Sequence, residues 1–432
     1  MIPRLMTLWE QVRASLWAVP AVMILAAVVS SILAARVEIG QGSDPVWFLY
    51  SGNAKNAPDF LFNLVTAMIT LATLAISITM VVLALAAQQL GPRLIRIFMS
   101  DLRTQVMLGL FISTVIYLVL VLRTVYGASD QVPNLAVTIG TGLVLLSIVM
   151  LQLFVHHLAR SIISDNVISK VGADLDANAA RLLSEPDQQA EQESDEIPDG
   201  PQAAIRVSSA GYIQAIDQKN LVDAACTAGC VIKLDVRAGH HVLPGAVIGH
   251  VVPAAALSPK LSQKIENSLL TGSERTSVQD LEFSIRQMVE VAVRALSPGV
   301  NDPYTALITI DRLTLSLALI MRRGPPQTHW CDGDDKVRLI LPASTFSGLL
   351  HASFDLIRQY GSDSVSVLIR LAERLSELRS LANSEQAREI SHHLEMVLHA
   401  GRRTIKEKSD LDAFEKRFES DKPGDAFPAP HF

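Results

Sequence analysis

The chain has 432 residues, of which 49% are hydrophobic and only 19% are charged. Soluble domains carry about 25% charged residues, so this chain is short of surface charge. The shortage lies in residues 1–160, which hold 9 Lys and Arg and 6 Asp and Glu, whereas residues 161–432 hold 28 and 37. This uneven composition excludes a wholly soluble enzyme and a disordered chain. The absence of a basic block argues against nucleic-acid binding.

Four stretches without charged residues stand out in the first third. A bilayer core needs about 20 apolar helical residues, so each stretch is long enough to span a membrane. Backbone groups inside lipid must be satisfied within the chain, which favours helices. The stretches are Ala14–Ala35, Phe60–Pro92, Thr104–Leu122 and Gln131–Ala159, the last with its apolar core at Leu135–Val155.

The flanking basic residues predict the orientation of these spans. Loops that are rich in Lys and Arg stay in the cytoplasm. The N-terminus, the loop after the second span and the segment after the fourth span carry the excess: Arg4, Arg13, Arg93, Arg96, Arg103, Arg160 and Lys170. We therefore expect a multi-pass membrane protein with both termini and the soluble part in the cytoplasm.

The second span carries a polar stripe. Its members are spaced by 3, 4, 3 and 4 residues, which places them on one side of a helix. One interpretation is close helix–helix packing, and the other is the polar lining of a path formed by several subunits. None of the four stretches contains a charged residue, which argues against a proton-coupled pump. The stripe consists of Asn63, Thr66, Thr70, Thr73 and Ser77.

The soluble part divides by composition. Residues 161–203 predict a juxtamembrane helix and an acidic linker. Residues 204–255 read as a small β module that resembles the barrel-sandwich hairpin of biotinyl and lipoyl domains. Residues 256–407 predict a helical domain with a β-hairpin near 330–341, and 408–432 a flexible tail. The predicted fold class is therefore a mainly α membrane protein: four transmembrane helices, a small β module and a helical cytoplasmic domain.

Two helices of the soluble part meet at a short polar elbow, Ser297–Asp302. The first helix is predicted over Asp280–Leu296, and the second begins at Pro303 with Asp302 as its N-cap. A tight capped turn is one interpretation, and a site for a small anionic ligand at the helix N-terminus is another. Catalysis lacks a nucleophile–base pair nearby. The candidate ligand residues are Arg286, Arg294, Ser297, Gly299, Asn301, Asp302 and Pro303.

The cysteines and histidines predict no metal site, and no cofactor is expected. Cys226 and Cys230 lack the spacing of zinc ligands, so we expect reduced thiols. His392, His393 and His399 lie in a predicted helix, where surface placement is the expectation.

The elbow segment also carries a family resemblance. Phe283–Ala306, with its Ala-Leu-Ser-Pro-Gly-Val-Asn-Asp-Pro run, resembles the signature of a bacterial family of predicted membrane proteins with a domain of unknown function. Ala210–Gln214 and Phe354–Gly361 are similar to two further segments of that family. The resemblance implies four N-terminal spans followed by a soluble region, and it implies no activity.

The leading hypothesis is a non-enzymatic, homo-oligomeric channel or transport-related protein in the lipid bilayer, gated by its cytoplasmic domain. The second hypothesis is a membrane-anchored sensor or scaffold whose soluble part binds a ligand or protein partner. A membrane-tethered enzyme is disfavoured because no catalytic constellation is visible.

Overall fold

A computed structural model describes residues 15–36, 50, 56–90, 95–127, 133–161, 164–183, 200–324 and 326–419. The chain forms two units, an N-terminal unit that ends at Ile163 and a C-terminal unit that begins at Ser164. Several sequence predictions fall outside the described residues: the N-terminal bases Arg4 and Arg13, the loop base Arg93, most of the acidic linker, and residues 420–432 of the expected tail.

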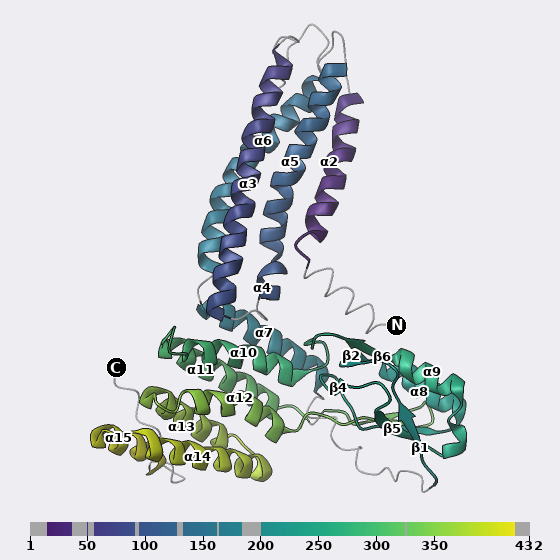
Figure 1. The fold of residues 1–432 in the computed structure, drawn as a ribbon, viewed down its shortest axis with the longest axis vertical. Coiled ribbons are helices and arrows are strands. Elements are labelled where there is room, and N and C mark those ends of the chain that lie inside the picture. Colours follow the sequence, from purple (N-terminus) through teal and green to yellow (C-terminus); the bar gives the residue numbers. More distant parts are fainter. Residues whose placement is uncertain are drawn as a thin grey trace. The chain divides into compact units, whose positions relative to one another are not determined.

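The N-terminal unit is a bundle of long apolar helices that run side by side (Figure 1). Helix α5 is at its centre, since half of its most apolar window is buried, against 22–28% for the other three long helices. His157 Nε2 of α6 lies 2.6 Å from Asp101 Oδ2 beside the start of α5, so the end of α6 and the start of α5 share one end of the bundle. The described helices are α2 (Ala18–Arg36), α3 (Ala57–Leu90), α4 (Ile95–Met99), α5 (Leu102–Gly127) and α6 (Asn134–Ser161).

Each predicted span corresponds to one long helix of this unit, and α3 is the longest. Its 34 residues reach about 50 Å at 1.5 Å per residue, beyond the roughly 30 Å of a bilayer core. By length and hydropathy alone, five described helices are long and apolar enough to cross a membrane. The fifth is α11 (Pro303–Met321), which belongs to the C-terminal unit and was not predicted as a span.

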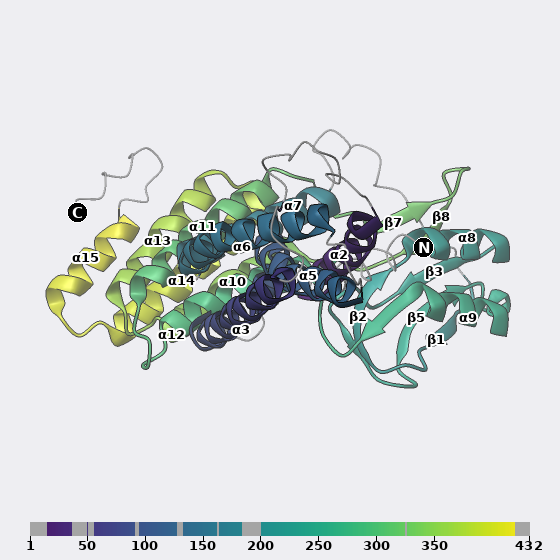
Figure 2. The ribbon, with the colours of Figure 1, turned by 90° about the horizontal axis from the view of Figure 1, so that it is seen from above.

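The β part of the C-terminal unit contains two sheets around one apolar core (Figure 2). The larger sheet has the order β1-β5-β3-β8-β7 with only β3 and β8 parallel, and the smaller is β4-β2-β6. Helices α8 and α9 pack on the same core, which includes Ile213, Leu221, Ile232 and Ile265. The elements are β1 (Ala203–Arg206), β2 (Gly211–Ile216), α8 (Gln218–Ala228), β3 (Val231–Leu234), β4 (His241–Val242), β5 (Val247–Val252), the short 3-10 helix η3 (Ala254–Ala256), α9 (Pro259–Ser268), β6 (Leu269–Gly272), β7 (His329–Cys331) and β8 (Val337–Ile340).

This β part is larger than the predicted module of residues 204–255. The hairpin expected inside the helical domain joins the larger sheet instead, because Ile232 and Lys233 of β3 pair with Leu339 and Ile340 of β8. Strand β6 also lies beyond residue 255, and α8 was not predicted. Long-range pairing of strands made this extension invisible to local patterns.

The helical part packs α7 against α10 and α11, with α12, α13 and α14 beyond them. Asp302 caps α11 as predicted, and α7 occupies part of the predicted juxtamembrane segment. The expected tail is wrong at its start, because Lys408–Glu419 forms a helix whose Phe414 is fully buried. The elements are α7 (Ser164–Leu182), α10 (Leu281–Ala295), α11 (Pro303–Met321), α12 (Phe346–Tyr360), α13 (Val365–Ser380), α14 (Ser384–Thr404) and α15 (Lys408–Glu419).

Candidate functional site

A cavity of about 650 Å³ lies in the C-terminal unit, where the β part meets the helical part. This volume is within the range of small-molecule sites. One wall is the corner between β2 and the first turn of α8, and another is the end of α7 with the start of α10. The lining includes the polar and aromatic residues Arg181, Asp217, Lys219, Arg237, Gln279 and Trp330.

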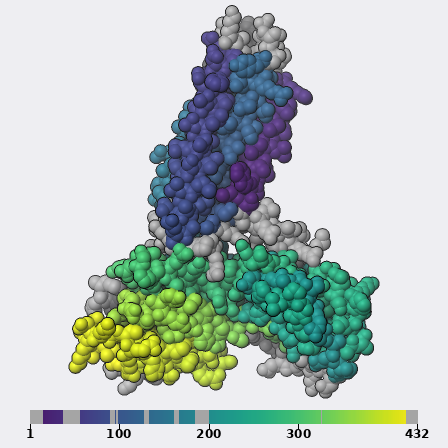
Figure 3. All heavy atoms as spheres, in the orientation of Figure 1, coloured from purple at the N-terminus to yellow at the C-terminus, as the bar shows by residue number. Residues whose placement is uncertain are grey.

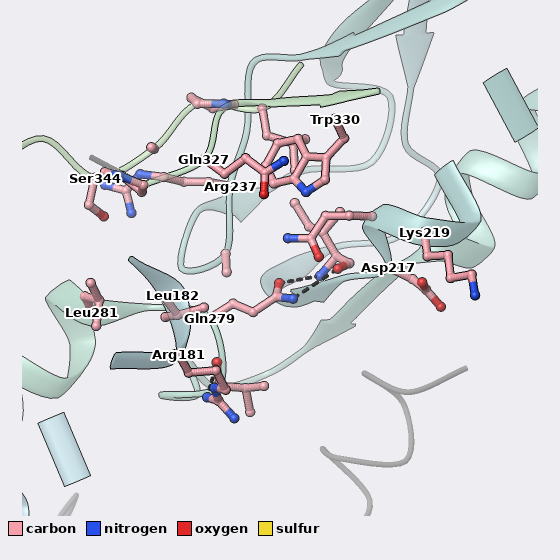
Figure 4. A pocket seen from close by; sticks show the side chains of 18 of the residues that line it. Arg181, Leu182, Asp217, Lys219, Arg237, Gln279, Leu281, Gln327, Trp330 and Ser344 are labelled. Carbon is pink, nitrogen blue, oxygen red and sulfur yellow. Dashed lines mark hydrogen bonds between the residues drawn. The ribbon is translucent and has the colours of Figure 1, made fainter. Parts of the chain in front are cut away.

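The side chain of Gln279 joins two walls of the cavity. Its amide accepts a hydrogen bond from Ile216 N at 2.8 Å and donates one to Ile216 O at 3.1 Å, as a neighbouring strand would. Arg181 of α7 donates to the carbonyl of Val278 at 2.6 Å. Figure 4 shows Trp330 and Gln279 on opposite sides of the cavity. The end of α7 is therefore held to the segment that leads into α10.

A layer of buried charge lies beside the cavity at the start of α10. Asp280 caps the helix, and its fully buried carboxylate accepts hydrogen bonds from Arg275 at 2.6 and 2.8 Å. Burial raises the pKa of Asp280 despite that partner. Gly239, at a φ of 90°, lies so close that an added Cβ would meet the Asp280 carboxylate. Only glycine meets both conditions, the left-handed backbone and the close approach.

The cavity has the chemistry of a binding site for a small polar molecule. Arg181, Lys219 and Arg237 supply positive charge, although Arg237 also pairs with Glu282 and the lining includes the acid Asp223. Asp217 is engaged as the N-cap of α8, where it accepts from Asn220 N at 3.2 Å. Trp330 offers an aromatic face, and amide side chains offer hydrogen bonds. This combination suits a ligand with an anionic group and a flat apolar portion.

The elbow between α10 and α11 is a turn whose polar groups bond one another. Ser297 Oγ donates to Arg294 O at 2.6 Å, and Asp302 N donates to Ala295 O at 2.8 Å. The Asp302 carboxylate accepts from the backbone N–H and the hydroxyl of Thr305, which places negative charge at the start of α11. A second anion there would meet that charge. The ligand site at this elbow remains a prediction.

The remaining elbow residues are mostly at the surface. Gly299 and Asn301 are exposed, and Asn301 has a left-handed φ of 48°. Pro303 occupies the first turn of α11 and is half-buried. Arg286 is exposed on α10, and Arg294 is half-buried.

The polar stripe of α3 faces outward from the bundle. All five members are exposed: Asn63, Thr66, Thr70, Thr73 and Ser77. The three threonine hydroxyls donate to carbonyls four residues earlier, at 2.8–3.0 Å. Figure 3 shows α3 uncovered along its length. Within one chain, therefore, the stripe does not mediate the packing of α3 on its neighbours.

Two histidine predictions hold, and one is wrong. His392 and His399 are exposed on α14, but His393 is only 2% exposed. The physical reason is its place on the face that carries Ile390, Leu394 and Val397, which packs inward. Of the thiols, Cys226 is exposed and Cys230 is buried, and burial raises the pKa of Cys230.

Sequence reasoning missed the cavity because its walls come from six separate segments between residues 181 and 344. The one local signal was the β-strand followed by Asp217, an N-cap residue at the start of α8. No local pattern predicts that Trp330 and Gln279 share a space.

The chain is similar to a family of membrane proteins and to individual proteins of two mycobacteria. Residues 13–377 match the family described as "Predicted membrane protein (DUF2254)". An uncharacterized protein of Mycobacterium tuberculosis is 28% identical over 421 residues, which cover 95% of this chain and 80% of that protein. An uncharacterized protein of Mycobacterium bovis matches with the same identity and coverage. No solved structure matches the chain.

Proposed function

The chain belongs to this family of predicted membrane proteins, and from that premise we propose that it is a homo-oligomeric channel or transport-related protein. The proposal places four spans in the bacterial inner membrane, with both termini and the C-terminal unit in the cytoplasm. The α3 stripes of several copies line the path, and the cavity at Arg181 and Trp330 binds a small anionic regulatory ligand.

The outward direction of the α3 stripe carries the proposal. Lipid tails offer no hydrogen bonds, so exposed amide and hydroxyl groups favour a partner that does. The threonine hydroxyls already donate to their own helix, which leaves acceptor lone pairs on that side. Asn63 adds an amide with two donors and one acceptor. Water or a second copy of α3 supplies the partners that lipid cannot.

Chain continuity links the cavity to the spans. Helix α7 begins three residues after α6 ends, and Arg181 and Leu182 at the other end of α7 line the cavity. A ligand that binds the Arg181 side chain competes with the hydrogen bond from Arg181 to the carbonyl of Val278, which anchors α7. We propose that this anchor transmits ligand binding to the spans through α7.

The test is ion flux through the purified full chain in liposomes, with Thr70→Val against wild type. Thr124→Val is the matched control, because Thr124 is also exposed and its hydroxyl also donates to a carbonyl four residues earlier, but on α5. We expect Thr70→Val to alter flux and Thr124→Val to leave it unchanged. Equal effects of the two substitutions would contradict a path along α3.

A second candidate function is a membrane-anchored sensor or scaffold, and the cavity favours it. In that case the spans only anchor the chain, and the C-terminal unit binds a ligand or protein partner. Absence of flux under several ion gradients, together with binding of a small anionic ligand that Trp330→Ala abolishes, would favour the sensor over the channel.

A further inference from the structure

Helices α12 and α14 bring together two histidines and an aspartate that do not line the cavity. His351 and Asp355 are one turn apart on α12, with His351 Nδ1 2.9 Å from Asp355 Oδ2. His393 of α14 completes the group, with its Nδ1 4.0 Å from Asp355 Oδ1. The two imidazole rings lie 4.4 Å apart between centroids. One ligand atom from each of the three residues lies within 4.8 Å of the others.

This cluster leaves polar atoms unsatisfied inside the protein. The side chain of His393 is 98% buried, since its exposure is 2%, and its Nε2 has no hydrogen-bond partner. Asp355 Oδ1 is also buried without a hydrogen bond. Buried polar atoms are normally paired, because an unpaired one costs about 1–3 kcal/mol. Asp355 Oδ1 faces His393 Nδ1 across 4.0 Å, so an ion bound between the two residues would give this buried oxygen a partner. The Nε of Arg358 on α12 is also buried without a hydrogen bond.

We propose that His351, Asp355 and His393 form a binding site for a divalent first-row transition metal of the zinc class. Two imidazoles and one carboxylate are a common zinc donor set, with the fourth position left to water. Imidazole donors favour Zn²⁺ over Mg²⁺ and Ca²⁺, which prefer oxygen ligands. Ligand atoms around tetrahedral zinc are about 3.3 Å apart at bonds of about 2.0–2.1 Å, so the three residues need to close by no more than about 1.5 Å.

The charge of the donor set suits a dication. An imidazole binds a metal through a nitrogen lone pair and adds no charge of its own. The Asp355 carboxylate supplies the negative charge that offsets part of the ion's charge.

One neighbouring guanidinium opposes the ion. Arg358 Nη2 lies 3.6 Å from Asp355 Oδ1 and competes for that oxygen. The other neighbour is His392, which is exposed and has its ring 6.4 Å from that of His393. If a metal takes the Asp355 oxygen, removal of Arg358 strengthens binding. If the cluster is only an ion pair with Arg358, its removal has no metal-dependent effect.

The site joins two helices of the helical part. His351 and Asp355 come from α12 and His393 from α14, so a bound ion cross-links them. A cross-link of this kind stabilises the folded state by mass action. The inference stands apart from the proposed channel function, since it concerns only these two helices.

The test is Zn²⁺ titration of the full chain in detergent, purified without a polyhistidine tag and treated first with a chelator. We expect one Zn²⁺ per chain and a melting temperature that rises with Zn²⁺ concentration. His351→Ala and Asp355→Asn should each weaken binding by more than about 100-fold, because loss of a direct ligand exceeds the effect of an outer-shell change. His399→Ala, on the exposed side of α14, is the matched control and should bind as wild type.

Co²⁺ provides a readout that a merely structural role would not give. Co²⁺ bound to this set should show the visible absorption of a tetrahedral site, and Asp355→Asn should lose it. Arg358→Gln should bind Zn²⁺ more tightly than wild type. No stoichiometric binding by wild type overturns the proposal, even if a variant fails to fold. So does binding that His351→Ala leaves unchanged, which would mark adventitious metal elsewhere.

Discussion

Helices α3 and α11 both satisfy the length and hydropathy of a membrane span, yet most of their uncharged polar side chains face in opposite directions. On α11 these side chains are buried: Thr305, Thr309, Thr314 and Ser316. On α3 the five stripe residues are exposed. Half of the apolar window of α11 is buried, against 28% for α3.

The difference teaches two things. Hydropathy identifies a helix that needs an apolar environment, and the direction of its polar side chains shows whether the same chain or another molecule provides their partners. Helix α11 has its partners within the C-terminal unit, where Ser316 donates to Asp176 of α7 at 2.7 Å and Arg312 pairs with the same carboxylate. Helix α3 directs its polar groups away from the rest of the chain. We therefore expect α11 to fold without contact with a membrane, and α3 to form its polar path together with a second copy of the chain.

The largest effect should come from removal of Asp176, which breaks the internal partnership of α11. Asp176→Ala leaves Arg312, 16% exposed, without its carboxylate. Loss of one partner of a buried pair costs about 3–5 kcal/mol, and the partial exposure of this pair reduces our expectation to about 2 kcal/mol. Chemical unfolding of the full chain, followed by the fluorescence of a probe in the C-terminal unit, measures this loss of stability. Asp410→Ala, at an exposed acid of α15, is the control, and an equal loss there would contradict this prediction.

The next effect concerns the α3 stripe itself. Joint replacement of Thr66, Thr70 and Thr73 by Val keeps shape and removes three hydroxyls. Interhelical hydrogen bonds in membranes contribute about 0.6 kcal/mol each, but a stripe that lines a water path makes none, so we expect association to change by less than about 1 kcal/mol. Cross-linking yield of the detergent-purified chain against dilution measures the association. A loss of about 1–2 kcal/mol in association free energy would show that the stripe packs against a neighbouring subunit and does not line the path.

A smaller effect should follow from pH at His240, a half-buried group of the C-terminal unit beside the cavity. Burial lowers the pKa of His240, and Arg237 and Arg275 lower it further, while Glu282 and Asp280 oppose the shift. The folded-state pKa is then below the unfolded value of 6.5. The stabilisation is complete above pH 6.5 and declines as pH falls below it, because the unfolded chain then binds the proton more tightly. His240→Asn should flatten this part of the stability–pH curve, and an unchanged slope would contradict the prediction.

The smallest effect is predicted for Leu315→Asp, which asks whether α11 touches lipid. Leu315 is 53% exposed on α11. A charge at the centre of a bilayer costs about 2.5–3.5 kcal/mol, whereas an exposed surface position tolerates it within about 0.5 kcal/mol. We expect expression, folding and melting temperature close to those of wild type. Loss of membrane-inserted protein would place α11 with the spans.

The sequence predicted those parts of the fold that depend on local patterns. The Asp302-Pro303 pair predicted the start of α11, and uninterrupted apolar stretches predicted the long helices, including α3. It failed where distant segments meet. The pairing of β3 with β8 joins residues about a hundred positions apart, and no periodicity records such a partner.

The candidate sites divide in the same way. The α3 stripe was visible because helix geometry alone aligns Thr66, Thr70 and Thr73, although its outward direction required the bundle. The cavity at Trp330 and the burial of His393 were not visible, since both depend on tertiary packing. Continuation of the chain as α15 was missed because its many charged residues resemble a solvated tail.

The most direct test of the central claim, that the α3 stripe faces water inside an oligomer, is thiol accessibility in membranes. In a background without Cys226, Cys230 and Cys331, single cysteines replace Thr70 on the stripe and Ile76, which is also exposed but lies off the stripe. We predict that a charged, water-soluble thiol reagent modifies Thr70→Cys and spares Ile76→Cys. Modification of neither residue, or of both equally, would contradict it.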